Sequence, residues 1–383
     1  MSRLRVGALI ALVQAVLGLR VAWRLLRTGG SSPIRPAPQA VVSMGSVGVI
    51  VPVLNEATRL SRCLDGLVAQ GAEVGEILLV DSGSHDTTCD LVRQYARRDG
   101  RIRLIQAGPS PRDWNGKVWG LQHGERALDA GSGWVLTLDA DVAPAPGLAS
   151  ALVAAAREQD VRLLSVATRQ CVSGPLEGLL HPAMLASLVY RFGRPNGVSS
   201  SPAGAMANGQ CCVFRRDLLQ ILGGFESARG SLCEDVTLAR LAASAGERVG
   251  FFEADDLVEA EMYADWREAW NNWPRSLATR DALFGLSGWL GLTEVLLVQA
   301  LPLVLLLLRP HRPLRQVNLC LVAMRMGVLC GIARAYAERP WTYWLSPFTD
   351  VPVALALWRS ALVPRHTWRG RAYVRQKGSI ISA

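Results

Sequence analysis

Metal-binding patterns of cysteine and histidine are missing from this 383-residue sequence. The five histidines form no cluster, and none of the eight cysteines belongs to a Cys-x-x-Cys pair. These absences argue against a zinc site or a disulfide framework. We expect reduced thiols that fill space, and on a strand the adjacent Cys211 and Cys212 would point in opposite directions.

Charged residues are also scarce. They make up 19% of the chain against 50% hydrophobic residues, which is more apolar than an average soluble domain. The formal net charge is nevertheless +9, and from Arg359 onward the chain has no acidic residue. Residues 364–383 follow an apolar segment directly, so we interpret them as a basic tail beside a membrane rather than a nucleic-acid surface.

An apolar run lies near the start of the chain. Residues 6–23 are long enough to cross a bilayer, and no small-residue cleavage site follows them. We therefore expect an uncleaved membrane anchor over residues 1–28 rather than a signal peptide. A linker rich in Gly, Ser and Pro follows, so that the next domain begins after residues 29–46.

Three more apolar segments occupy residues 281–363. We expect 283–308 and 317–337 to span the membrane, whereas 345–363 either spans it or lies in its interface. The arginine-rich loop around residue 312 and the basic tail cannot both face the cytoplasm if every segment crosses. We resolve this with two crossings and one interfacial helix, which keeps the central domain and the tail inside.

The central domain, residues 47–280, has the alternating pattern of an α/β fold. Short apolar runs are typical of strands, and the segments between them have helical periodicity. This alternation predicts a Rossmann-like, mostly parallel sheet that binds ligands at the carboxyl ends of its strands. No Gly-x-Gly-x-x-Gly follows the first strand, which argues against a dinucleotide-binding dehydrogenase. The expected strands are 47–53, 76–80, 102–106 and 134–138, and the expected helices are 56–70, 86–98 and 116–130.

Acidic residues follow the last of these strands. Asp139 and Asp141 are separated by one residue, so both carboxylates can reach one site. Carboxylate oxygens are the ligands that Mg²⁺ or Mn²⁺ prefers, and such a cation neutralises charge on a leaving diphosphate. The alternative is a strand that ends in solvated aspartates, because this motif is short and common.

Four motifs in a fixed order make the metal site the better interpretation. Asn55-Glu56 ends the first strand, Asp81-Ser82-Gly83-Ser84 ends the second, Asp139-Ala140-Asp141 follows later, and Glu234-Asp235 comes last. Together they resemble the family 2 inverting glycosyltransferases, which have the GT-A fold. The resemblance covers residues 47–280, and the order of the four motifs is more specific than any one of them.

The resemblance implies a role for each motif. Asp81 would accept a hydrogen bond from the nucleoside base, Asp139 would contact ribose or diphosphate, and Asp141 would ligate the metal. Asp235, with Glu234 beside it, would be the general base that takes the acceptor's proton. The alternative for this acidic pair is a helix N-terminus. The implied substrate-binding residues are Pro52, Asn55, Glu56, Asp81, Ser82, Lys117, Asp139, Trp273 and Arg275.

Two further stretches refine the resemblance. Trp114-Asn115-Gly116-Lys117 is similar to a segment of the branch that acts on lipid-like acceptors, which includes ceramide, hopanoid-associated and carotenoid glycosyltransferases. The C-terminal 368–373 stretch resembles a Trp-Arg-Gly-Arg-x-Tyr segment of the same branch. Lys117, at a helix start, would meet diphosphate oxygens, although an ordinary exposed lysine would look the same in the sequence.

Residues 266–276 take the place of the Gln-x-x-Arg-Trp motif of processive polysaccharide synthases but lack its order. This favours a single-addition enzyme, in which Arg275 still braces the diphosphate. The helical spacing of Trp266, Trp270 and Trp273 fits either an amphipathic helix at the bilayer surface or core packing.

The sequence thus predicts an integral protein of the cytoplasmic membrane whose catalytic domain faces the cytoplasm. It would transfer a sugar, with inversion, from a nucleotide-diphosphate donor to a hydroxyl of a lipid-like acceptor, with Mg²⁺ or Mn²⁺ as cofactor. A carotenoid is the first choice of acceptor, before hopanoid or sphingolipid-like alcohols. The alternatives are a polyprenyl-phosphate or polysaccharide-forming synthase of the same fold, and a catalytically inactive membrane scaffold.

Overall fold

The computed structural model describes residues 2–28, 32–36, 42–172, 174–195, 197–263, 265–276, 285–363, 365–368, 371–376 and 379–382. Its first elements are α1 (Ser2–Arg27), β1 (Val47–Val53), α2 (Leu60–Val68), β2 (Val74–Asp81), α3 (Thr88–Ala96), β3 (Ile102–Gln106), α4 (Gly116–Ala127), β4 (Trp134–Leu138), β5 (Val142–Pro144), α5 (Leu148–Glu158), β6 (Leu163–Ala167) and β7 (Arg169–Gln170).

The chain continues with α6 (Pro175–Phe192), β8 (Gly197–Ser199), β9 (Cys211–Arg215), α7 (Arg216–Leu222), η2 (Phe225–Ala228), α8 (Glu234–Ser244), β10 (Val249–Glu253), η3 (Asp255–Leu257), β11 (Val258–Ala260) and α9 (Trp266–Ser276). Its last elements are α10 (Leu286–Glu294), η4 (Val295–Ala300), α11 (Leu301–Leu307), α12 (Arg312–Ile332), η5 (Ala333–Ala335), η6 (Trp341–Thr349), α13 (Asp350–Leu362), β12 (Arg365–Trp368), β13 (Arg371–Gln376) and β14 (Ser379–Ser382).

An eight-stranded sheet forms the centre of the α/β part, in the order β3-β2-β1-β4-β9-β6-β10-β8. Its first four strands are parallel, β9 runs antiparallel to both of its neighbours, and β8 is antiparallel to β10. The predicted α/β fold with a mostly parallel sheet is therefore confirmed. Because the parallel strands end at the same edge, the loops after β1, β2 and β4 lie together there.

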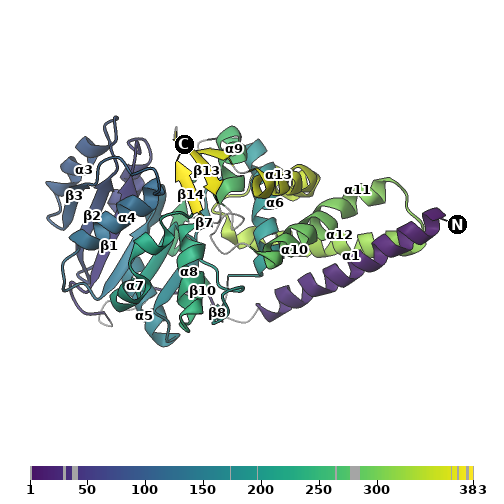
Figure 1. Ribbon diagram of the computed structural model, residues 1–383, viewed down its shortest axis with the longest axis horizontal. Helices are drawn as coiled ribbons and strands as arrows, with labels where there is room; N and C mark the ends of the chain where they lie inside the picture. The colour runs from purple at the N-terminus through teal and green to yellow at the C-terminus, as the bar shows by residue number, and fades with distance from the viewer. Residues whose placement is uncertain are drawn as a thin grey trace.

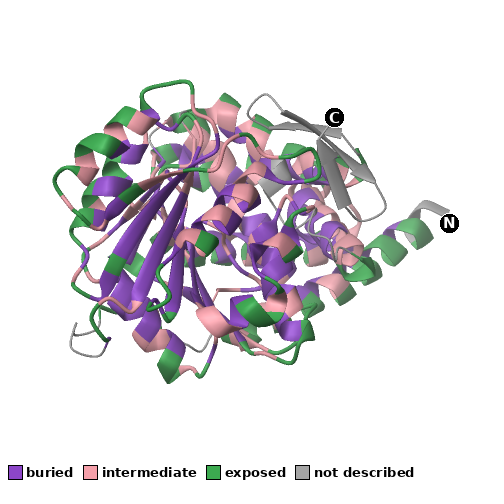
Figure 2. Ribbon diagram, turned by 60° about the vertical axis from the view of Figure 1, so that its left-hand side comes forward, coloured by how far each residue is buried: buried purple, intermediate pink, exposed green. Residues whose placement is uncertain are grey.

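The strands are apolar throughout because helices cover both faces of the sheet (Figure 2). Val49 and Val51 point into the core beneath α2, α3 and α5, whereas Ile50 points into the core beneath α4, α7 and α8. Cys211 and Cys212 also point to opposite faces, as expected from strand alternation. All eight cysteines are free thiols.

The bounds of the predicted strands agree closely with the structure. Three of the four match β1, β3 and β4, and the fourth, 76–80, is the centre of the longer β2. The predicted helices were too long, because α2, α3 and α4 each end two or three residues earlier and α2 begins four residues later. The residues predicted as helix beyond these ends belong to the loops between helices and strands.

Two small sheets complete the β-structure. Strands β5, β11 and β7 form one, and β12, β13 and β14 form the other. The second sheet comes from residues 365–382, where the sequence predicted only a basic tail. Secondary structure was not part of that prediction, which rested on charge alone.

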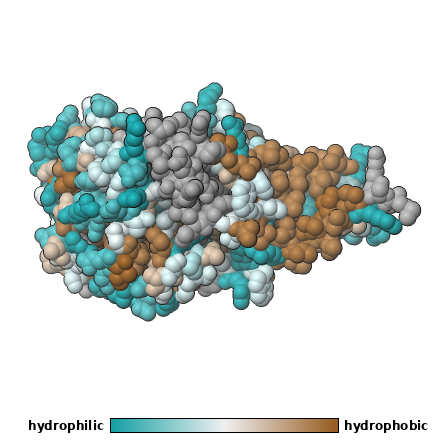
Figure 3. All heavy atoms as spheres, in the orientation of Figure 1, coloured by the Kyte–Doolittle hydropathy of each residue, from teal (hydrophilic) through white to brown (hydrophobic). Residues whose placement is uncertain are grey.

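The helical part extends from one side of the α/β part (Figure 1). By length and composition three of its segments can cross a membrane: Arg5–Arg27, Leu286–Leu307 and Arg312–Ala335. The second of these runs through α10, η4 and α11. Apolar side chains dominate the surface of this extension, in contrast to the hydrophilic α/β part (Figure 3). The weaker predicted segment, 345–363, divides into η6 and α13, and neither is among the candidate spans.

Buried polar pairs join these helices. Glu294 on α10 is fully buried and lies 2.7 Å from Arg20 and 2.8 Å from Arg24 of α1. Arg325 of α12 pairs with Asp350 of α13 at 2.9 Å, and both are almost fully buried. Charged groups remain buried among apolar helices only when they are paired in this way. The pairs therefore define how α1, α10, α12 and α13 pack.

Candidate functional site

A large cavity opens at the carboxyl edge of the sheet. Its volume is about 1090 Å³, at the upper end of the range for ligand pockets, which leaves room for two substrates. Three of the four aspartates that the sequence singled out line it, namely Asp139, Asp141 and Asp235. They come from the loop after β4 and from the first turn of α8. The fold thus brings together residues that lie almost 100 positions apart.

Lys117 joins the two acidic motifs. Its Nζ lies 2.6 Å from Asp139 Oδ1 and 2.8 Å from Glu234 Oε1, and it donates a hydrogen bond to the Gly209 carbonyl at 3.0 Å. Burial opposes its charge, but the two carboxylates outweigh that effect and raise the pKa of Lys117 well above its usual value. The lysine is therefore a permanent cation at the centre of the site.

The start of α4 holds this lysine in place. The Asn115 side chain accepts a hydrogen bond from the Lys117 N–H at 2.9 Å and so caps the helix. Gly124, two turns further on, lets α4 approach the sheet, because a Cβ there would lie 2.4 Å from Ile50 Cγ2. The prediction of Lys117 at a helix start is correct, although its contacts here are carboxylates.

Asp141 has the features of a cation ligand. Its Oδ1 is buried and has no hydrogen-bond partner among the residues that the structure describes. Burial, together with the charges of Asp139 and Glu56, raises the pKa of Asp141 to about 8. A bound cation would give the unpaired oxygen a partner. It would also stabilise the buried negative charge of Asp141.

No group of three or more His, Cys, Asp or Glu side chains that could hold a metal occurs in the described part of the chain. Asp139 and Asp141 thus offer two carboxylates at most. This number suits Mg²⁺ or Mn²⁺ in nucleotide sites, where substrate phosphates and water supply the other ligands. The donor set fits such a cation and does not fit zinc.

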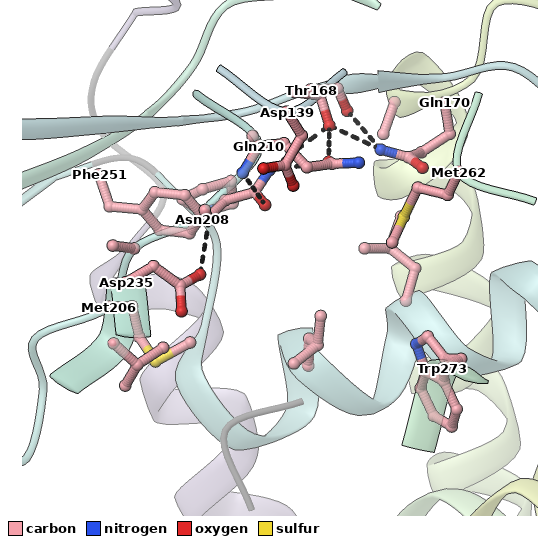
Figure 4. A pocket seen from close by; sticks show the side chains of 18 of the residues that line it. Asp139, Thr168, Gln170, Met206, Asn208, Gln210, Asp235, Phe251, Met262 and Trp273 are labelled. Carbon is pink, nitrogen blue, oxygen red and sulfur yellow. Dashed lines mark hydrogen bonds between the residues drawn. The ribbon is translucent and has the colours of Figure 1, made fainter. Parts of the chain in front are cut away.

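Asp235 lies in the first turn of α8 and faces the cavity (Figure 4). Its Oδ2 accepts a hydrogen bond from the Gly209 N–H at 2.5 Å. Burial and the neighbouring charge of Glu234 raise the pKa of Asp235 to about 7. A carboxylate with this pKa is a stronger base than an exposed one, yet it is still ionised in part at neutral pH. The helix-terminus interpretation is correct, and it leaves Asp235 placed where it could also act as a base.

The loops after β1 and β2 are tied to each other. Asn55 adopts a left-handed backbone, with φ of 56°, donates its N–H to Ser84 Oγ at 2.9 Å and accepts the His85 N–H at 2.9 Å. Asp81 accepts the Gly83 and Ser84 N–H groups at 3.2 and 3.0 Å. Both side chains thus shape the loops from within.

The predicted substrate-binding residues divide into two groups. Pro52, Glu56, Ser82, Lys117, Asp139 and Trp273 line the cavity, whereas Asn55 and Asp81 are not among its lining residues. Trp273 of α9 lies across the opening from Asp235 (Figure 4) and is buried with the helical core. Core packing is therefore the better interpretation for this tryptophan than the bilayer surface. Arg275 lies on α9, but its side chain falls outside the described residues.

A chain of polar side chains on the cavity wall was missed in the sequence. Thr168 Oγ1 donates to Gln210 Oε1 and accepts from Gln170 Nε2 at 2.7 Å, and Asn208 Nδ2 donates to the same Oε1 at 3.1 Å (Figure 4). Gln210 Nε2 is buried and has no partner in the described structure. The available signal was Asn208-Gly209-Gln210 directly before an apolar strand. Because β9 runs antiparallel to β4, its start lies at the edge of the sheet where β4 ends.

Comparison with known proteins agrees with this geometry. Residues 48–223 match the family model described as Glycosyl transferase family 2. These residues form a glycosyl transferase family 2 domain. The match begins in β1 and ends after α7, so the family 2 domain includes the strand-end loops, Lys117, Asp139 and Asp141 but stops short of Asp235.

Two curated relatives and one solved structure are similar to different lengths of the chain. The 4,4'-diaponeurosporenoate glycosyltransferase of Staphylococcus haemolyticus (strain JCSC1435) is 25% identical over 238 residues, 61% of each chain. The PGL/p-HBAD biosynthesis glycosyltransferase of Mycobacterium bovis (strain BCG / Pasteur 1173P2) is 35% identical over 94 residues, 24% of this chain and 34% of the relative. The chain thus spans between about a third and three fifths of these relatives' lengths.

The solved structure is the mannosyltransferase PcManGT from Pyrobaculum calidifontis, in complex with GDP-Man and Mn²⁺. It superposes with a TM-score of 0.54 at 20% identity and covers 94% of this chain and 98% of its own. At this identity the likeness is one of fold. It extends beyond the family 2 domain to most of the chain and agrees with the GT-A architecture of the sheet.

Proposed function

We propose that the protein transfers a sugar from a nucleotide-diphosphate donor to a hydroxyl of a lipid-like acceptor, with inversion at the anomeric carbon. The observation that carries this proposal is the meeting of Asp139, Asp141 and Asp235 in one cavity with Lys117 between them. The family 2 domain and the nucleotide sugar bound to the structural neighbour support the donor class.

Each part of the site has a role in this proposal. The backbone of the loops shaped by Asn55 and Asp81 receives the nucleoside, beside Pro52 and Ser82. Asp141 and Asp139 would hold Mg²⁺ or Mn²⁺, which when bound stabilises negative charge on the diphosphate. The structural neighbour was solved with Mn²⁺, which supports a divalent cation of this kind.

Asp235 is the proposed general base. The acceptor oxygen forms the new bond to the anomeric carbon while the bond to the diphosphate breaks, and the diphosphate leaves with the electron pair. The acceptor's proton moves to Asp235. Glu234 keeps the pKa of Asp235 high enough for this, and the Gly209 N–H fixes the direction in which the carboxylate points.

The charges around the cavity favour an uncharged alcohol over a phosphate as the acceptor. Among the described residues, eight acidic and five cationic side chains line it, a formal excess of three negative charges before a metal or donor binds. Each lining arginine already lies within 4 Å of a carboxylate. A phosphorylated acceptor would have to break such pairs, so a polyprenyl-phosphate synthase is the weaker alternative. The four pairs are Arg59–Glu268, Arg169–Asp256, Arg194–Glu253 and Arg334–Glu253.

A carotenoid alcohol remains the first choice of acceptor. The support is the similarity to the 4,4'-diaponeurosporenoate glycosyltransferase, together with three helices that are long and apolar enough to cross a membrane. We propose that the protein is integral to the cytoplasmic membrane, with the catalytic domain on the cytoplasmic side where nucleotide sugars are made.

The test uses the purified full-length protein in detergent. A panel of labelled nucleotide sugars, including UDP-glucose and GDP-mannose, is incubated with a lipid extract and Mn²⁺ or EDTA, and products are identified by mass spectrometry. We expect metal-dependent transfer in the wild type and a loss of ~10²-fold or more in Asp235→Asn, with donor binding kept.

Asp217→Asn is the matched control, because Asp217 occupies the first turn of α7 as Asp235 does in α8 but lies outside the cavity. Normal transfer by Asp235→Asn would show that the base is misassigned. Equal donor binding with and without divalent ions would remove the metal from the proposal.

A further inference from the structure

The cavity continues from the catalytic edge into the helical part. Beyond Asp235 its wall is formed by α1, α6 and α12, through apolar residues such as Leu25, Leu26 and Met324. None of the described residues that line it on these three helices carries an acidic, lysine or arginine side chain. The helices α1 and α12 are also two of the three segments able to cross a membrane.

Close contacts join the middle of α1 to the first half of α12. A Cβ on Gly18 of α1 would lie 2.7 Å from Leu321 of α12, and Gln14 donates to Asn318 Oδ1 at 3.1 Å. Nearer the catalytic domain α1 is held elsewhere, because Arg20 and Arg24 pair with Glu294 of α10.

At that level α12 presents two glycines to the cavity. Gly327 and Gly331 both line it, and nothing lies within 4 Å of a Cβ built on either. Leu25 and Leu26 of α1 line the same cavity. The space between the two helices is therefore open near the C-terminal ends of α1 and α12. These are the ends nearer the α/β part (Figure 1).

We infer that this opening between α1 and α12 is the entrance for the acceptor, and that its occupant is the uncharged hydrocarbon chain of a membrane lipid whose hydroxyl end reaches Asp235. The inference rests on the proposed function. A long apolar chain stays in the bilayer because exposing its surface to water costs free energy, so an acceptor of this kind must enter sideways. An apolar wall continuous with Asp235 meets that requirement.

The test uses full-length protein reconstituted in phosphatidylcholine vesicles with two photoreactive probes. Both are octadecan-1-ol with one diazirine, placed either next to the hydroxyl or at the far end of the chain. After illumination the labelled residues are mapped by mass spectrometry. We expect the hydroxyl-side probe to label the wall near Met206 and Asp235, and the far-end probe to label α12 around Gly327 and Gly331.

The deciding comparison is Gly331→Trp against Leu319→Trp. Both substitutions place an indole on α12, but Leu319 is 53% exposed on the outer surface and does not line the cavity. We expect Gly331→Trp to lower labelling near Asp235 at least fivefold and Leu319→Trp to leave it at the wild-type level. If Gly331→Trp melts at a lower temperature than the wild type, Gly327→Leu takes its place, and labelling near Asp235 is measured in the same way.

If Gly331→Trp and Gly327→Leu were labelled near Asp235 as strongly as the wild type, the opening would not be the acceptor's entrance. The same would follow from a hydroxyl-side probe that labels only the outer surface of the helices. Wild-type hydrolysis of UDP-glucose and GDP-mannose is measured in parallel. If the wild type is labelled as expected but hydrolyses neither nucleotide sugar, the proposed function is contradicted. The inference about the entrance is then still supported.

Discussion

Glu234 and Lys117 act on Asp235 in opposite directions. Glu234 raises the pKa of Asp235 by charge repulsion, whereas Lys117 lowers it by attraction. Both neighbours also pair with each other at 2.8 Å, so the three groups form one electrostatic unit. Burial is the largest cause of the raised pKa of Asp235, and the opposing charges of Glu234 and Lys117 adjust it further.

This balance predicts the pH dependence of transfer. Asp235 must be deprotonated to accept a proton, and its pKa is about 7, so kcat/KM should fall as the pH drops below 7. At pH 6 about a tenth of the plateau rate should remain. Glu234→Gln removes the repulsion and should move this fall to lower pH. Lys117→Met removes the attraction and should move it to higher pH.

The measurement is kcat/KM for the acceptor, determined from pH 5 to 9 at a saturating donor concentration. Asp217→Asn serves as a control and should reproduce the wild-type profile. If both variants shifted the acidic limb in the same direction, or if the limb stayed where it was, a group other than Asp235 would control the reaction.

Among the elements, α4 depends on close contact with the sheet. A Cβ on Gly124 would lie 2.4 Å from Ile50 and 3.1 Å from Val80. Overpacking of this kind costs ~1–3 kcal/mol, of which the better helix propensity of alanine offsets about 1 kcal/mol. The net loss is at most ~2 kcal/mol, so Gly124→Ala should lower the melting temperature by up to about 8 °C. Because Lys117 lies on the same helix, the rate of transfer should fall as well.

Gly133→Ala, in the loop before β4, is the control, since its added Cβ would meet nothing within 4 Å. Both proteins are compared by thermal melting in the same detergent and by transfer rate at saturating donor. A Gly124→Ala protein as stable and active as Gly133→Ala would mean that α4 tolerates a shift away from β1.

The strand-end motifs could be predicted because they follow from local pattern. The apolar run of β4 and the spacing of Asp139 and Asp141 are visible in the sequence, and parallel strands end at one edge. The wall built from Thr168, Gln170 and Gln210 could not, because each residue alone is an ordinary polar residue of a loop or short strand. Its role arises from hydrogen bonds between positions about 40 residues apart.

Long-range pairing also limited the prediction of the helical part. Periodicity placed Trp273 on one face of a helix, but whether that face meets lipid or protein depends on α6 packing against it. Arg325 and Asp350 are charged residues inside the apolar segments 317–337 and 345–363. In the structure they neutralise each other across α12 and α13, so their presence does not exclude a membrane segment.

At the scale of the whole molecule, the helices suggest an arrangement across the membrane. A Cβ on Gly7 would collide with His311, so the loop between α11 and α12 lies beside the start of α1. Both are remote from the α/β part (Figure 1). Three crossings by α1, by α10 to α11 and by α12 would then leave the N-terminus and the loop on one side and the catalytic domain on the other.

This arrangement makes a prediction about topology. A reporter at the N-terminus and one inserted after Pro310 should both read as external, whereas a reporter fused after residue 383 should read as cytoplasmic. Alkaline phosphatase, active outside, and green fluorescent protein, fluorescent inside, give opposite signals at each site. Each fusion must keep transfer activity, which shows that the helices have inserted as in the native protein.

Because Gly7 and His311 are in contact, opposite readings at the N-terminus and at residue 310 cannot occur in a membrane crossed in this way. Such readings would mean that the apolar helices pack together without spanning the bilayer.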